Sequence, residues 1–176
     1  AAACAEKVSE IVRGRTPGDV LMFLPDEKTI REVAGAIEDL KLRGIRVLPL
    51  FGSQSPDEQR EVFRRTRERR IILATNIAET SLTIDGVVHV VDSGLIKQVQ
   101  YVNATMSALV VTDHSKAGCD QRKGRAGRTQ PGVCHRLYSA DEFAARPDFT
   151  EPDILRTALD AVLLHTGRPR FPRHPN

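Results

Sequence analysis

Residues 19–50, DVLMFLPDEKTIREVAGAIEDLKLRGIRVLPL, contain two apolar runs separated by a stretch with helical spacing. The runs at 19–24 and 45–50 have the length and composition of buried strands. Between them, apolar residues recur at intervals of three and four: Ile30, Val33, Ala34, Ile37 and Leu40. This spacing predicts a helix over residues 28–42, ended by Gly44. A strand–helix–strand unit of this kind is typical of parallel sheets.

The pattern repeats toward the middle of the chain. Residues 70–74 (RIILA) and 87–91 (VVHVV) predict two further strands. Between the second and third strands, Ser55, Pro56 and Glu58 predict a capped helix, which we expect to turn Val62 and Phe63 inward. Because strands alternate with helices and are apolar throughout, the sequence predicts an α/β fold with a mostly parallel sheet covered by helices on both faces.

The pattern changes after residue 92. Two β-prone runs around Asn103 predict an inserted β-hairpin, and Ser115 is expected to cap the helix that follows. Residues 133–138 predict a last strand, and residues 139–142 a second capping box. We expect residues 1–14 to be a linker or boundary helix, 15–148 one domain, 149–166 a helix leading toward a further domain, and 167–176 an irregular tail.

Composition narrows the class of protein. With 176 residues, 40% hydrophobic and 28% charged, the chain has the composition of a soluble globular domain. A net charge of +3 is compatible with nucleic acid without requiring it. Three cysteines without a CxxC pair favour reduced thiols in a cytoplasmic protein and argue against zinc. No apolar run approaches the roughly 18 residues of a membrane span. One arginine cluster reads as a solvated helix end: Arg64, Arg65, Arg67, Arg69 and Arg70.

The motif QRKGRAGR at 121–128 places four cations in eight residues, interrupted by two glycines. On a helix, Gln121, Arg125 and Arg128 would share one face. Two guanidinium groups and an amide on one face suit a polyphosphate, because arginine offers fixed pairs of donors to phosphate oxygens. Taken alone, the motif is equally compatible with a solvated basic helix.

The segment ATNIAETSLTIDG at 74–86 follows a predicted strand and is rich in small polar residues. Ligands of open α/β sheets bind beyond the carboxyl ends of strands, although such residues also favour turns and caps. The sequence has no GxxxxGK[ST] phosphate loop and no strand that ends in paired carboxylates for Mg²⁺. The arginines would therefore act on a nucleotide whose phosphate cradle and metal lie elsewhere.

The segments at 74–86 and 121–139 resemble motifs V and VI of DEAH/RHA-type superfamily 2 ATP-dependent RNA helicases. LMFLP at 21–25 resembles motif IV, and residues 48–63 resemble the segment after it. Residues 137–159 are similar to the bacterial HrpA-like branch. The resemblance covers about residues 15–165 and implies the second RecA-like domain without its first partner. A winged-helix-type domain would follow.

The resemblance implies roles at the nucleotide. Gln121, Arg125 and Arg128 would meet the γ-phosphate, the two arginines as fingers across the cleft between the lobes. Ser81 would sense that phosphate, and Asp85 would lie near the ribose. Phe63 would stack on the adenine, although a place in the core is an equal alternative. The implied ligand is ATP with Mg²⁺, the metal being held mainly by the first lobe and not by this chain.

The resemblance also implies contacts with RNA. Thr75 and Asn76, and Gly52 and Ser53 after the second strand, would touch the RNA backbone. The hairpin that starts at Lys97 and ends at Val111 would separate strands. Expected partners are RNA, the first RecA-like domain and, as a further candidate, an activating protein; no membrane is expected. Four histidines are read as structural, among them one that replaces a tryptophan frequent in some relatives: His89, His114, His135 and His165.

The sequence therefore predicts the second motor lobe of an ATP-dependent RNA helicase, inactive when isolated. Three alternatives stay open. One is a non-catalytic nucleic-acid-binding module, and another is an interaction domain of a larger remodelling complex. The third is a helicase acting on DNA, since discrimination from RNA would rest on 2′-hydroxyl contacts.

Overall fold

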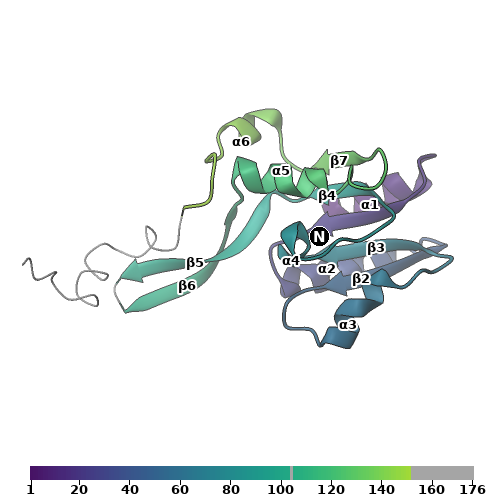
Figure 1. Ribbon diagram of the computed structural model, residues 1–176, viewed down its shortest axis with the longest axis horizontal. Helices are drawn as coiled ribbons and strands as arrows, with labels where there is room; N and C mark the ends of the chain where they lie inside the picture. Colours follow the sequence, from purple (N-terminus) through teal and green to yellow (C-terminus); the bar gives the residue numbers. More distant parts are fainter. Residues whose placement is uncertain (104, 152–176) are drawn as a thin grey trace, which may run out of the picture. The chain divides into compact units, whose positions relative to one another are not determined.

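The computed structural model describes residues 1–103 and 105–151, and its main feature is a five-stranded parallel sheet (Figure 1). The strand order is β2-β3-β1-β4-β7, and every neighbouring pair is parallel. The strands are β1 (Asp19–Phe23), β2 (Ile45–Leu50), β3 (Arg69–Ala74), β4 (Val87–Asp92) and β7 (Val133–Arg136). The predicted α/β class is confirmed.

Two helices cover one face of the sheet. α1 (Ala2–Arg13) buries Ala5, Val8 and Ile11, and α2 (Glu27–Asp39) buries Ile30, Val33 and Ile37. Both helices pack against side chains that alternate along the strands, such as Val20 and Met22 in β1. Successive strand residues point to opposite faces, so Leu21 and Phe23 belong to the second core layer.

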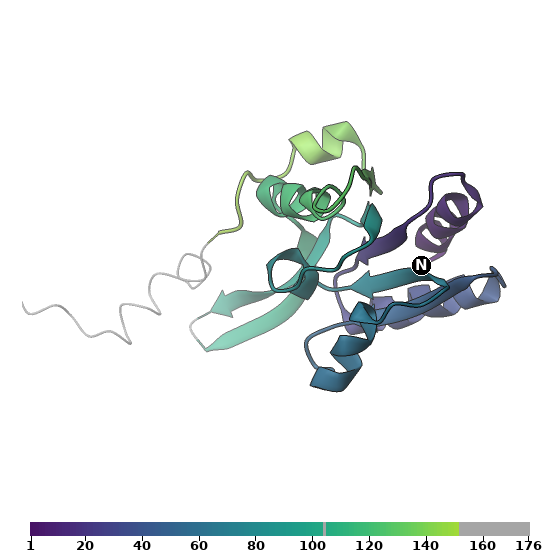
Figure 2. The ribbon, with the colours of Figure 1, turned by 45° about the vertical axis from the view of Figure 1, so that its right-hand side comes forward.

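Shorter elements cover the opposite face (Figure 2). They are α3 (Pro56–Arg60), the 3₁₀ turn η1 (Glu61–Phe63), α4 (Ile77–Thr80) and α5 (Lys116–Gly124). Val62 of η1, Ala78 of α4 and Ala126 after α5 all enter this second core layer. Because the covering elements are short, loops and turns form much of this face.

Helix starts follow the predicted caps. Ser55 and Glu58 form a capping box at α3, and Ser139 and Glu142 form another at α6 (Ala140–Ala144). The Ser115 side chain accepts a hydrogen bond from the amide of Gly118 at the start of α5. These motifs are local in sequence, which explains why the sequence alone predicts them.

Three local predictions are wrong. α2 ends at Asp39, well before Gly44, because Lys41 takes a φ of 50° and turns the chain out of the helix. Val62 is buried, but Phe63 is 42% exposed, because the 3₁₀ turn places only one of the two residues against the sheet. Arg69 belongs to β3 and not to a solvated helix end, and Arg70, which the cluster also included, lies in the strand that was predicted over residues 70–74.

The described residues fall into two compact units: residues 1–97 and 111–150 form the first, and residues 98–103 and 105–110 belong to the second. Strands β5 (Leu95–Asn103) and β6 (Met106–Asp113) pair as the predicted hairpin, and both are longer than expected. The Asn103 carboxamide oxygen accepts hydrogen bonds from the amides of Thr105 and Met106, each at 3.0 Å, at the hairpin turn. The predicted helix at 149–166, apart from its first residues, and the tail at 167–176 lie outside the described residues.

Among residues 1–103 and 105–151, no helix is both long and apolar enough to cross a membrane.

Candidate functional site

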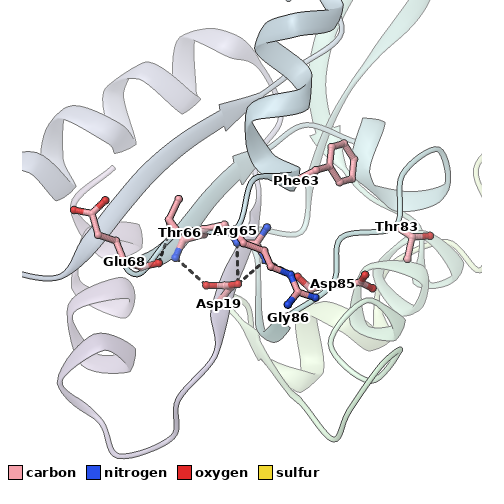
Figure 3. Close-up of a pocket in the computed structure, with 9 residues that line it drawn as sticks. Asp19, Phe63, Arg65, Thr66, Glu68, Thr83, Asp85 and Gly86 are labelled. Atoms are coloured by element: carbon pink, nitrogen blue, oxygen red, sulfur yellow. Dashed lines mark hydrogen bonds and ion pairs between the residues drawn. The ribbon is translucent and has the colours of Figure 1, made fainter.

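A cavity of about 500 Å³ opens near the amino ends of β1 and β3 (Figure 3). Its volume lies in the range of small-molecule sites. The structure brings Phe63 and Asp85 to this one cavity, together with Thr83, although they are far apart in sequence. The lining residues are Asp19, Phe63, Arg65, Thr66, Glu68, Arg70, Thr83, Asp85 and Gly86.

Arg70 holds the walls of this cavity together. Its Nη2 and Nε donate to Asp19 Oδ2 at 2.6 and 2.9 Å, and its amide donates to Asp19 Oδ1 at 2.8 Å. The same guanidinium also donates to the carbonyls of Val62 and Asp85. Gly86 permits this packing, because a Cβ atom there would lie 2.9 Å from Asp19 Oδ2. Arg70 therefore fixes the residues next to Phe63 and Asp85.

The arginine motif does not form one helical face, and this prediction is wrong. α5 ends at Gly124, Arg125 is its C-cap, and Arg128 lies in the turn beyond. The helix ends there because glycine is a poor helix former and Ala126 turns into the core. Arg125 and Arg128 nevertheless line one small hollow, formed with Leu82, Ile84 and residues of the sheet. Gln121 is exposed on α5 and is not among the residues that line this hollow.

The two arginines of the hollow form a positively charged pair. Burial lowers the pKa of Arg125, and the charge of Arg128 lowers it further. Arg125 Nη1 donates to the carbonyl of Leu82 at 3.3 Å. Within the described part of the chain, neither arginine forms an ion pair with a carboxylate. Two neighbouring guanidinium groups that form no ion pair within the described residues are suited to an anion such as phosphate.

A second group of predicted residues lies at the opposite end of the strands. β2 and β3 are neighbours, and Leu50 pairs with Ala74, so the residues that follow them share the carboxyl edge of the sheet. There the amide of Thr75 donates to the carbonyl of Leu50 at 3.1 Å. Three residues at this edge are exposed: Gly52, Ser53 and Asn76. The Asn76 side chain does not cap α4.

One crossover segment connects both ends of the sheet. β3 and β4 both pair with β1 in parallel, so residues 75–86 must return from the carboxyl edge to the amino edge. Thr75 starts this segment and Asp85 lies near its end beside the cavity, while Ala78 anchors its middle in the core. Ser81 is exposed after α4, one residue before Leu82, which contacts Arg125.

Sequence reasoning also missed a buried cluster of three charged residues: Arg122, Glu79 and Asp92. Arg122 is fully buried and forms ion pairs with Glu79 of α4 and Asp92 of β4. No local signal distinguishes Arg122 from the exposed Lys123 beside it, because its partners lie 43 and 30 residues away.

Metal ligands are a separate question. Over residues 1–103 and 105–151, no group of three or more His, Cys, Asp or Glu side chains is arranged to hold a metal ion.

Comparison with known proteins adds to this geometry. Residues 4–130 match the family described as the helicase conserved C-terminal domain. The chain belongs to this family. It is 47% identical over 148 residues to the ATP-dependent RNA helicase HrpA of Escherichia coli strain K12, which covers 84% of the chain and 11% of that protein. It is 43% identical over 157 residues to the putative ATP-dependent RNA helicase ucp12 of Schizosaccharomyces pombe, covering 86% of the chain and 12% of that protein.

A solved structure agrees with the sequence relatives. The E. coli DExH-box NTPase HrpB superposes with a TM-score of 0.84 at 32% identity, covering 93% of this chain and 20% of that one. The resemblance to DEAH/RHA helicases and the RecA-like fold are therefore confirmed. This helicase domain spans only 11% to 16% of the length of the curated relatives named HrpA and DHX34.

Proposed function

We propose that this domain is the second motor lobe of an ATP-dependent RNA helicase of the DEAH/RHA type. The observation that carries the proposal is the Arg125–Arg128 pair, which has no carboxylate partner among the described residues and lines its own hollow. In this role both arginines act as fingers that stabilise the charge developing on the γ-phosphate of ATP. Gln121 joins them when a first lobe closes over the nucleotide.

The cavity would receive the nucleoside part of ATP. Phe63 is 42% exposed beside it, and its ring offers a stacking surface for adenine. The carboxylate of Asp85 and the hydroxyl of Thr83 can accept hydrogen bonds from ribose hydroxyls. Ser81 is exposed one residue before Leu82, which lines the arginine hollow, and in this role it senses the γ-phosphate.

The phosphate cradle and Mg²⁺ belong to the first lobe in this proposal. The sequence has no phosphate loop, and the described residues offer no cluster of metal ligands. The fitting residues of this chain are donors, which suit phosphate oxygens rather than a cation. When bound, Mg²⁺ would neutralise phosphate charge.

The carboxyl edge of the sheet would grip the RNA backbone. Small exposed groups at Gly52, Ser53 and Asn76, with Thr75 beside them, can approach phosphates and sugars closely. Such contacts carry no sequence information and weaken with salt. The hairpin of β5 and β6 would separate strands. The relatives' names, which include ATP-dependent RNA helicase, support RNA as the substrate.

Closure of the two lobes would connect these two sites. The crossover segment carries the proposed RNA-binding residues at one end and Asp85 at the other, so RNA and ATP would both contact this one segment. Nucleotide-dependent closing and opening would then move RNA along the protein.

The test compares the natural polypeptide that contains both lobes with this chain alone. We expect RNA-stimulated ATP hydrolysis and duplex unwinding by the polypeptide, and neither activity by the 176-residue chain. RNA binding without any ATP hydrolysis by the polypeptide would contradict the proposal and favour a binding module. Equal stimulation by DNA would contradict the choice of RNA.

A further inference from the structure

Arg122 is the largest side chain that is fully buried among the described residues, although Gln121 and Lys123 on either side are exposed. Its Nε donates to Glu79 Oε1 at 2.8 Å, and its Nη1 donates to Asp92 Oδ1 at 2.8 Å. Its Nη2 donates to the carbonyl of Leu95 at 2.9 Å. The guanidinium carbon lies 5.1 Å from the centroid of the Phe23 ring. Arg122 thus faces the interior and does not face the hollow.

This arrangement requires the shape of arginine. Three nitrogens of one planar group serve two carboxylates and one carbonyl on three different elements. Lysine has a single ammonium at the end of a flexible chain and cannot reproduce these directions together. Arg122→Lys therefore preserves the charge and removes the fork.

Further side chains fix the two carboxylates. His114 Nε2 lies 2.9 Å from Glu79 Oε1 and donates to it, and the His114 ring packs on α5 where a Cβ at Gly118 would lie 2.1 Å from ring atoms. The Tyr138 hydroxyl donates to Asp92 Oδ2 at 2.6 Å. Burial, and then this bond to Asp92, raises the pKa of Tyr138, so the phenol stays protonated as a donor.

The Arg122 network joins the two sites of the proposed function by short paths. On α4, the amide of Glu79 donates to the carbonyl of Asn76 at 3.0 Å, next to the proposed RNA contacts. On α5, the amide of Arg125 donates to the carbonyl of Arg122 at 3.1 Å, next to the proposed finger. The Glu79–Arg122 ion pair therefore links α4 directly to α5.

We infer that Arg122 is a positioning residue that transmits the state of the RNA-gripping segment to Arg125. A shift of Asn76 on binding RNA moves Glu79, and the ion pair moves the end of α5 with it. This inference rests on the proposed function and adds a route by which RNA stimulates hydrolysis. Arg122 touches neither ligand in this account.

The experiment measures ATP hydrolysis by the natural polypeptide with and without single-stranded homopolymer RNA. The variants are Arg122→Lys and Glu79→Gln, and Lys123→Ala is the matched control on the exposed side of α5. We expect both network variants to lose RNA stimulation of kcat by about fivefold or more, which is the scale of a site-to-site coupling. The KM for ATP, and RNA affinity without nucleotide, should change by less than about twofold. The double variant should lose no more RNA stimulation of kcat than the more impaired single variant, because both substitutions break the same ion pair.

Thermal unfolding of each variant separates coupling from folding. If stimulated and unstimulated rates fall together in proportion to the folded fraction, Arg122 is only structural and the inference is overturned. Full stimulation in a folded Arg122→Lys variant also overturns it. If Arg122→Lys does not fold, Glu79→Gln, which keeps the side-chain shape, decides by the same criterion. A wild-type protein without any RNA stimulation would instead contradict the proposed function itself.

Discussion

Asp19→Ala should destabilise the domain strongly, because it leaves a buried guanidinium without its carboxylate. The Asp19 and Arg70 side chains are only 17% and 9% exposed, and three donors of Arg70 point to Asp19. Removing one partner of a buried ion pair costs about 3–5 kcal/mol. Arg70 keeps its bonds to the carbonyls of Val62 and Asp85, so we expect the low end, about 3 kcal/mol.

The assay is equilibrium unfolding of the 176-residue chain in urea. With a slope of about 2 kcal/mol per molar urea, the midpoint should fall by about 1.5 M. Glu32→Ala is the control, since its pair with Lys28 is exposed and long at 4.0 Å, and it should leave the midpoint unchanged. A midpoint shift for Asp19→Ala as small as that of the control would refute the structural role given to this ion pair.

Three further predictions follow from burial. Phe63→Ala should raise the KM for ATP of the natural polypeptide with little loss of stability, because the ring is exposed at the cavity. Val62→Ala, at the fully buried neighbouring position, should lower the free energy of unfolding by about 2 kcal/mol and leave the KM unchanged. The reverse pattern would contradict the nucleotide site. Burial lowers the folded-state pKa of His89 and His135 from 6.5, so protonation favours the unfolded chain. The free energy of unfolding in urea should therefore be highest above pH 6.5 and decline as the pH falls to 5. A flat profile between these pH values would count against the burial of the two histidines. Burial raises the pKa of Cys134 to about 11, so this thiol should react with iodoacetamide at pH 8 far more slowly in the folded than in the unfolded chain, and equal rates would contradict the structure.

The fold follows from features that are local or periodic in the sequence. Residues 71–74 of β3 are all apolar because Ile71 and Leu73 enter one core layer while Ile72 and Ala74 enter the other. The capping boxes need only four consecutive residues. The end of α2 was not predictable in this way, since Lys41 adopts a left-handed conformation that its residue type disfavours.

The site depends more on tertiary packing. Phe63 and Asp85 meet because β1, β3 and the crossover segment place them at one cavity, which no spacing in the sequence encodes. Arg125 and Arg128 share a hollow through a turn and not through the helix that their spacing suggested. Arg122 appeared to be one more surface cation, because its carboxylate partners are distant in sequence.

The central claim is that Arg128 acts on ATP during hydrolysis. The most direct test measures kcat of the natural polypeptide at saturating ATP and RNA for the wild type, Arg128→Ala and Arg67→Ala. Arg67 is the control, because it is exposed and lines neither the cavity nor the arginine hollow. Nucleotide affinity is measured separately. We predict a loss of kcat of about 10³-fold for Arg128→Ala, with folding and nucleotide binding retained, and no change for Arg67→Ala. Equal kcat in all three proteins would contradict the account.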